Sequence, residues 1–226
     1  MNKVNDIIKF LKSQSSEKNK EGMARFGIKV EKAFGISIPI LRSIAKKNKK
    51  NHELALQLWK TGYHEAMILA SMIDAPDEVS SKQMDEWIKE FNSWDLCDQC
   101  CLNLFAYCDN AFEKAMEWTK REKEFERRAG FALMACLAFK HKKANDENFY
   151  QFFEPIKKYS TDERNFVRKA VNWALRQIGK RNKTLHPKAI KLAKEIEKIN
   201  SKSARWIAKD AIRELTSEAV IKRINK

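Results

Sequence analysis

Two short segments of the chain combine tryptophan with charged side chains at helical spacing. In the first, residues 93–98, Trp94 and Asp98 are four residues apart and therefore lie one above the other on a helix. Asp98 points roughly 120° away from the centre of the apolar side. For Asp98, a salt bridge to a neighbouring helix competes with a functional role. Asp95 is best interpreted as a cap or first-turn charge, because a carboxylate suits the positive end of a helix.

The second segment covers residues 165–180 and predicts an amphipathic helix. Its apolar stripe is formed by Val167, Ala170, Val171, Ala174, Leu175 and Ile178. Trp173 lies roughly 130° from the centre of that stripe, with Lys169, Arg176 and Lys180 on the same side. Two interpretations are about equally strong. Trp173 either packs against a neighbouring helix, or contacts nucleic acid while the cations hold phosphates.

One carboxylate and two tryptophans are suited to breaking the glycosidic bond of an N-alkylated purine. Such bases carry a positive charge and are already good leaving groups. The reaction therefore needs no general acid. It needs a group that stabilises the oxocarbenium-like sugar and positions a water, and a carboxylate can do both. Aromatic faces favour a nearby cation by ~0.5–2 kcal/mol each. The same three residue types also fit a purely structural role.

Charge points to a polyanionic partner. The 226 residues carry 45 Lys and Arg against 30 Asp and Glu, a formal net charge of +15. Nucleic acid and anionic membrane are the natural partners at such a charge, and RNA remains open on this ground. Residues 164–194 contain ten basic residues and no acidic one. A solvated face is the ordinary reason for a charge run, but its length here favours a specific anionic partner.

Cysteine usage and hydropathy indicate a reducing compartment. No apolar run approaches the ~20 residues that span a bilayer, and residues 1–10 lack the apolar core of a signal peptide. Four of the five cysteines fall within twelve residues of one expected helix. They are better explained as small buried hydrophobes than as a disulfide framework or a zinc site. We therefore expect a cytoplasmic protein, in a bacterial-type cytosol or nucleoid, without metal or other cofactor.

Helical periodicity continues through almost the whole chain and predicts an all-α fold. The expected helices are 3–14, 19–28, 38–48, 51–60, 64–74, 80–91, 94–108, 110–120, 124–140, 146–158, 163–179, 187–199, 203–214 and 217–224. Short links between them predict antiparallel hairpins, arranged either as a bundle or as a superhelical HEAT/armadillo-like solenoid. The helix over 125–139 is apolar on nearly all sides and should be buried. No break in composition divides the chain, so a single repeat domain over 1–226 is expected.

The chain resembles the HEAT-like DNA alkylation repair family, the AlkD-type alkylpurine DNA glycosylases. The resemblance is carried by MARF (23–26), GISIPILR (35–42), LW (58–59) with Glu65, SWDLCD (93–98), ERRA (126–129) and RKAVNWALR (168–176). Their order and spacing are specific when taken together. The resemblance implies the solenoid and a basic groove that holds duplex DNA. It also implies release of 3-methyladenine and 7-methylguanine by a monofunctional glycosylase that does not flip the base.

The resemblance also implies roles for individual residues. Asp98 corresponds to the catalytic aspartate of the family, and Trp94 and Trp173 correspond to the tryptophans that flank the deoxyribose. The DNA backbone would be held by Arg128, Arg168, Lys169, Arg176 and Lys180. Two departures, Phe26 for an aromatic hydroxyl and Ser93 for a second aromatic, affect substrate range and groove shape.

Three functional hypotheses follow. The first is a DNA glycosylase that excises cationic purines from alkylated double-stranded DNA. It would act as a monomer and would not bind a membrane. The second is a non-catalytic HEAT-repeat protein that binds DNA structures, since the family includes such relatives. The third, a helical scaffold for other proteins, is disfavoured by the ten-cation segment.

Overall fold

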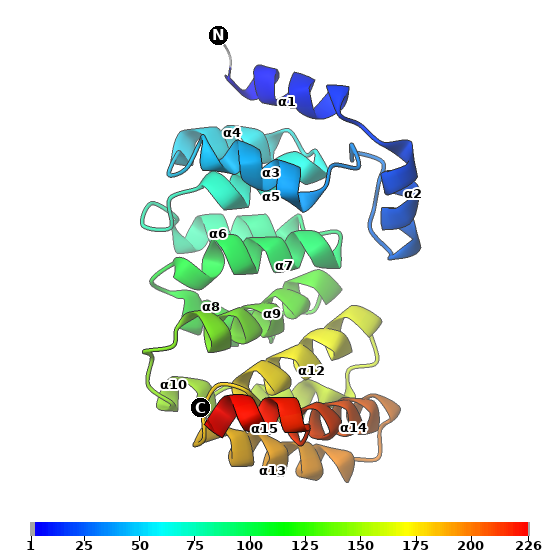
Figure 1. Cartoon of the computed structure of the whole chain (residues 1–226), viewed down its shortest axis with the longest axis vertical. Helices are drawn as coiled ribbons and strands as arrows, with labels where there is room; N and C mark the ends of the chain where they lie inside the picture. The colour runs from blue at the N-terminus through cyan, green and yellow to red at the C-terminus, as the bar shows by residue number, and fades with distance from the viewer. Residues whose placement is uncertain (1–2, 226) are drawn as a thin grey trace. The chain divides into compact units, whose positions relative to one another are not determined.

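The computed structural model describes residues 3–225. Within them all regular structure is helical, and most links between successive helices are short, apart from residues 26–37 between α2 and α3 (Figure 1). Two compact units divide the chain, unit 1 ending at Asp109 and unit 2 beginning at Asn110. The all-α class is therefore as predicted, whereas one continuous repeat domain over 1–226 stays a prediction. None of the helices described is long and apolar enough to cross a membrane.

Unit 1 is organised around one buried helix. Its helices are α1 (Lys3–Ser13), α2 (Glu17–Arg25), α3 (Ile38–Lys46), α4 (His52–Lys60), α5 (His64–Ile73), α6 (Ser81–Lys89), α7 (Trp94–Asn103) and the 3-10 turn η1 (Phe105–Tyr107). The sequence of α5, HEAMILASMI, is apolar on nearly every side, so this helix is buried with α3, α4 and α7 packed against it. Position 62 takes positive φ (67°), which explains why Gly62 separates α4 from α5.

A buried carboxylate fixes the loop that leads into α3. The Glu65 side chain, at the start of α5, accepts hydrogen bonds from the backbone N–H groups of Phe34 (2.9 Å), Gly35 (2.7 Å) and Ile36 (3.1 Å). Gly35 has φ of 77°, and a Cβ there would lie 2.4 Å from the Ser16 carbonyl oxygen. Glycine is therefore required on both conformational and steric grounds, which accounts for two of the recognisable sequence positions, 35 and 65.

Unit 2 is built around α9. Its helices are α8 (Ala111–Trp118), α9 (Glu124–Lys140), α10 (Glu147–Tyr150), α11 (Phe153–Lys158), the 3-10 turn η2 (Tyr159–Thr161), α12 (Asn165–Gly179), α13 (Leu185–Glu197), α14 (Lys202–Leu215) and α15 (Glu218–Asn225). As predicted, α9 is buried almost throughout, between α8 and α12. α13 and α14 pack on α12 and on each other.

The predicted helices correspond to the observed ones with two exceptions. The expected helix over 146–158 is divided into α10 and α11, and Pro155 lies in the first turn of α11, where its missing N–H needs no partner. The expected helix over 94–108 ends at Asn103 and continues as η1. The last residue of α12 is Gly179, whose φ is not positive. Its importance is steric, since a Cβ there would lie 2.7 Å from the Leu215 side chain of α14.

Candidate functional site

The start of α7 carries the predicted tryptophan and carboxylate. Trp94 is the first residue of the helix, Asp98 follows one turn later, and both are half-buried. The Trp94 indole N–H donates a hydrogen bond to the backbone carbonyl of Phe26 at 3.0 Å. That bond connects residues 68 positions apart and holds the indole in one orientation. Trp94 and Asp98 therefore share an accessible part of α7, as the i, i+4 spacing predicts.

Phe26, which follows α2, is more important to this site than the sequence alone indicated. Its side chain is 71% exposed, the largest value among the exposed large hydrophobic residues described, while its carbonyl supports Trp94. The predicted departure from an aromatic hydroxyl therefore falls beside Trp94. A long-range contact of this kind has no signal in helical periodicity, and only the resemblance to the family drew attention to position 26.

A buried ion pair anchors the start of α7 to α5. His64 Nε2 lies 2.8 Å from Asp95 Oδ2. Burial opposes ionisation of Asp95, but the hydrogen bond and charge of His64 outweigh it and hold the Asp95 pKa below its usual value. Burial likewise opposes protonation of His64, yet Asp95 and Glu65 raise its pKa. Asp95 is a first-turn charge, as expected, and it also has a buried histidine partner on α5.

The exposed side of α12 carries Trp173 and Lys169. Lys169 is exposed and Trp173 is half-buried, so Trp173 is neither a core residue nor a fully open one. With the Gln177 amide oxygen turned toward them, Gln177 accepts hydrogen bonds from Trp173 Nε1 at 3.1 Å and from Lys180 Nζ at 3.2 Å. The Trp173 indole is thus positioned by its own helix, while part of its surface faces solvent.

Two of the predicted cations, Arg176 of α12 and Lys180 directly after it, are paired with carboxylates of α14. Lys180 Nζ lies 2.5 Å from Glu214 Oε1, and Arg176 contacts both Glu214 and Asp210. Burial opposes ionisation of Glu214, but Lys180 and Arg176 outweigh it and lower the Glu214 pKa. The segment 164–194 contains no Asp or Glu, so the carboxylate that neutralises Arg176 and Lys180 comes from α14, 34–38 residues later in the chain. DNA contacts by Arg176 and Lys180 stay predictions.

The other two predicted arginines are engaged within unit 2. Arg128 is only 5% exposed, and its Nη1 donates to the Phe166 carbonyl at 2.6 Å, which fixes the first turn of α12. Arg168 is half-buried, with its guanidinium carbon 5.0 Å from the centroid of the Trp206 ring. A phosphate contact by either residue stays a prediction, and the position of Arg128 favours an indirect role through α12.

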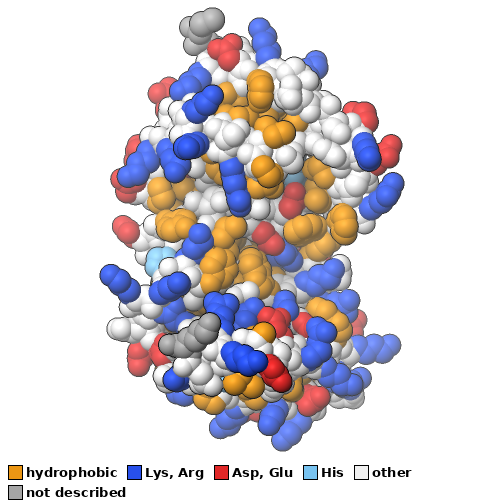
Figure 2. All heavy atoms as spheres, in the orientation of Figure 1, with side chains coloured by type: hydrophobic (Ala, Val, Ile, Leu, Met, Phe, Trp, Pro, Cys, Tyr) orange, Lys and Arg blue, Asp and Glu red, His pale blue; other side chains and the backbone are white. Residues whose placement is uncertain are grey.

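The predicted site residues are thus distributed over both units. Trp94 and Asp98 belong to unit 1, and Trp173 belongs to unit 2 together with Arg128, Arg168, Lys169, Arg176 and Lys180. Lys and Arg side chains gather over the C-terminal helices of unit 2 in the face shown in Figure 2.

Among the residues described, no group of three or more His, Cys, Asp or Glu has the arrangement of a metal site. All five cysteines are buried, and burial raises the pKa of Cys108 to about 12.

Two uncharacterized Listeria proteins are similar to this chain. The one from Listeria innocua is 24% identical over 170 residues, covering 74% of each chain. The one from Listeria monocytogenes is 22% identical over the same share of both chains. Neither carries a described function.

One solved structure is similar over nearly the whole length. It comes from a new family of proteins related to the HEAT-like repeat DNA glycosylases with affinity for branched DNA structures. It has 24% sequence identity and a TM-score of 0.78, over 93% of this chain and 94% of the other. The similarity establishes the HEAT-like repeat fold that periodicity and the family resemblance predicted. The DNA alkylation repair enzyme family matches residues 7–215, and the chain therefore belongs to that family.

Proposed function

We propose that this protein is a monofunctional DNA glycosylase that releases cationic N-alkylated purines, such as 3-methyladenine and 7-methylguanine, from duplex DNA. The observation that carries the proposal is the paired placement of Trp94 and Asp98 on α7. The indole is fixed by the Phe26 carbonyl, and the helix start is fixed by the His64–Asp95 pair. A carboxylate one helical turn from a fixed aromatic ring is suited to stabilise a developing sugar cation.

In the proposed reaction the bond between C1′ of the deoxyribose and the purine nitrogen breaks. Its electron pair leaves with the base, which becomes neutral, and C1′ becomes an oxocarbenium-like cation. The Asp98 carboxylate stabilises that cation and orients a water, whose oxygen bonds to C1′ while its proton passes to the carboxylate and then to solvent. The products are the free base and an abasic site. The lesion stays within the duplex, so no base-flipping pocket is required.

The tryptophans and cations have supporting roles in the proposal. Trp94 lies against the deoxyribose of the lesion, where its face favours positive charge, and Trp173 contacts the DNA from α12. Lys169, Arg168, Arg176 and Lys180 hold the flanking phosphates, and Arg128 acts by positioning the first turn of α12. Membership of the DNA alkylation repair enzyme family supports this substrate class. A monomer in the cytosol or nucleoid, where such DNA lies, belongs to the same proposal.

A second candidate is a DNA-binding protein without excision activity. It is favoured by the solved structure with a TM-score of 0.78, whose own family has affinity for branched DNA structures. In this case Trp94, Asp98 and Trp173 would each contact DNA without taking part in a reaction. The two candidates differ in whether Asp98 controls a rate or only the shape of a binding surface.

The decisive test compares wild type, Asp98→Asn and Asp77→Asn in release of free 7-methylguanine from methylated duplex DNA. Asp77 is an exposed residue of unit 1 and serves as the matched control. We expect release by wild type and Asp77→Asn, and a single-turnover rate at least about 100-fold lower for Asp98→Asn, equivalent to ~2.7 kcal/mol of transition-state stabilisation. DNA affinity should change little. Tight DNA binding by all three proteins with no release by wild type would instead establish the second candidate.

A further inference from the structure

The solvent side of α14 carries a tryptophan among cations. Its core side consists of Ser203, Ala204, Ile207, Ala208, Ala211 and Leu215. Five exposed residues, here called the α14 strip, lie within a sector of roughly 100° on the other side: Lys202, Arg205, Trp206, Lys209 and Arg213. The two carboxylates of the helix, Asp210 and Glu214, lie outside that sector. Both contact Arg176 of α12, and Asp210 also pairs with Arg213, the last cation of the strip. The strip itself is therefore cationic.

Trp206 is exposed yet held in place. It is 38% accessible, and the Arg168 guanidinium lies over its ring at 5.0 Å from the centroid. A tryptophan left this open forgoes part of the stabilisation that burial would bring, and Trp206 is not among the buried residues of α14. Stacked on one side by an arginine, the indole is oriented for a second planar partner.

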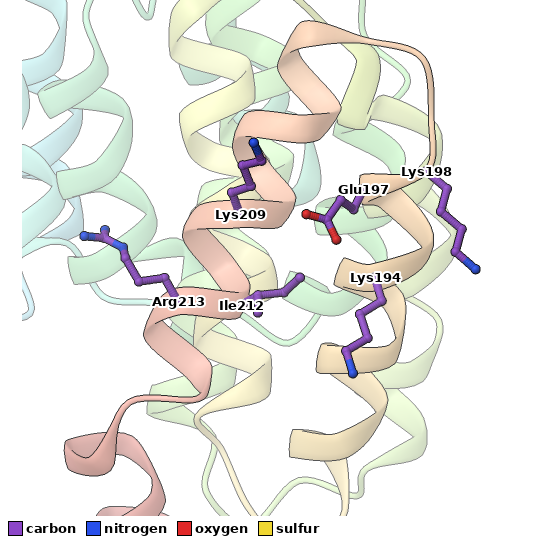
Figure 3. Close-up of a pocket in the computed structure, with 6 residues that line it drawn as sticks. All are labelled: Lys194, Glu197, Lys198, Lys209, Ile212 and Arg213. Carbon is purple, nitrogen blue, oxygen red and sulfur yellow. The ribbon is translucent and has the colours of Figure 1, made fainter.

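The cations follow the helix at intervals suited to a phosphate chain. Lys202, Arg205, Lys209 and Arg213 are separated by three or four residues, about one turn each, and the strip is ~16 Å long. Beside it lies a hollow of about 500 Å³ between α13 and α14. It is lined by Lys194, Glu197, Lys198, Lys209, Ile212 and Arg213 (Figure 3). In that view Glu197 and Ile212 point into the space between the helices, whereas Arg213 points away from α13.

We propose that the α14 strip binds single-stranded DNA, with a base stacked on Trp206 and successive phosphates on the cations. Aromatic rings interleaved with a basic track are how proteins hold unpaired strands without sequence preference. An anionic membrane would need a broad apolar side on the helix, and Trp206 is the only apolar residue of the strip. This binding is additional to base excision and does not require that Asp98 be catalytic.

The test measures fluorescence anisotropy of a labelled oligothymidylate titrated with the full chain. Trp206→Ala should weaken binding by about 5- to 100-fold, whereas Trp206→Phe should retain most of the affinity. Phe10→Ala, which removes an exposed aromatic of unit 1, is the matched control and should bind like wild type. Lys209→Gln should reduce the slope of log affinity against log salt by ~0.7. Circular dichroism checks that each variant is folded.

Wild-type affinity in Trp206→Ala would overturn the proposal, as would equal losses in the Ala and Phe variants. Binding to phosphatidylserine vesicles that depends on Trp206, with oligothymidylate affinity unaffected by it, would assign the strip to a membrane instead. The measurement involves no base excision. A failure of the glycosylase proposal and a failure of this one are therefore distinguishable.

Discussion

At the scale of single residues, the His64–Asp95 pair links the start of α7 to pH. The raised pKa of His64 means that its contribution to stability is fully present below the unfolded value near 6.5 and is lost as pH rises through the folded value. The pKa of Asp95 is lowered on folding, so its contribution to stability is fully present above the unfolded value of about 3.8. That contribution is lost as pH falls through the folded value. The pair is therefore strongest between those limits.

We expect the difference in Tm between wild type and His64→Gln to be larger at pH 5.5 than at pH 9. The reason is that deprotonation of His64 removes the charge that the variant also lacks. Thermal unfolding followed by circular dichroism over this pH range measures the difference. His186→Gln, which removes an imidazole lying beside the Gly179 carbonyl, is the control. A Tm difference for His64→Gln that is constant over the range would show that the pair contributes packing and not charge.

Individual residues also show where sequence analysis reached its limit. Periodicity predicted that Trp94 and Asp98 share a side of α7 and that Trp173 lies outside the core stripe of α12. It could not predict the Phe26 carbonyl that receives the Trp94 N–H, or the burial of Arg128. Both depend on segments 38 or more residues away, and i, i+4 spacing carries no information about them.

At the scale of elements, most helices could be predicted because an apolar stripe with a 3.6-residue period is a local property. The charge balance of a helix is not local. The segment 164–194 contains no carboxylate, yet Arg176 and Lys180 are compensated by Glu214 from α14. Likewise, acidic residues between 74 and 98 serve as internal partners, Asp74 for His52 and Glu90 for Trp59. A run of like charges in the sequence therefore does not show which of its residues face solvent without a partner, whereas an apolar pattern does show where a helix forms.

Two helical glycines, one packed against a neighbouring helix and one in open space, should respond in opposite ways to replacement by alanine. A Cβ at Gly130 would lie 2.7 Å from the Thr119 backbone nitrogen and 2.9 Å from the Ala115 carbonyl oxygen, so α8 and α9 would have to separate. We expect Gly130→Ala to lower the free energy of unfolding by about 1–3 kcal/mol. Gly22→Ala, on α2 with nothing within 4 Å of its Cβ, should raise it by about 0.5–1 kcal/mol. Urea denaturation measures both, and equal effects would mean that α8 yields without cost.

At the scale of the whole molecule, the net charge of +15 gives every anionic ligand a general attraction. Specific contacts must be distinguished from it, because a chain with this excess binds DNA weakly at low salt through any exposed lysine. The distinction lies in the salt dependence, since each phosphate neutralised at a fixed site releases a defined amount of counterion. Lys169 is the most informative residue for this purpose, because it is exposed on the same helix as Trp173 and lies in the acid-free segment.

We expect Lys169→Gln to reduce the slope of log affinity against log salt for duplex DNA by about one. Lys82→Gln, at an exposed lysine of α6 whose side chain is 85% accessible, is the matched control and should leave the slope unchanged. Anisotropy titrations of a labelled duplex at several salt concentrations provide both values. Equal reductions in the two variants would mean that duplex DNA is held by diffuse attraction to the whole cationic surface. A reduction confined to Lys169→Gln would place a backbone phosphate on α12, beside the tryptophan proposed to contact the lesion.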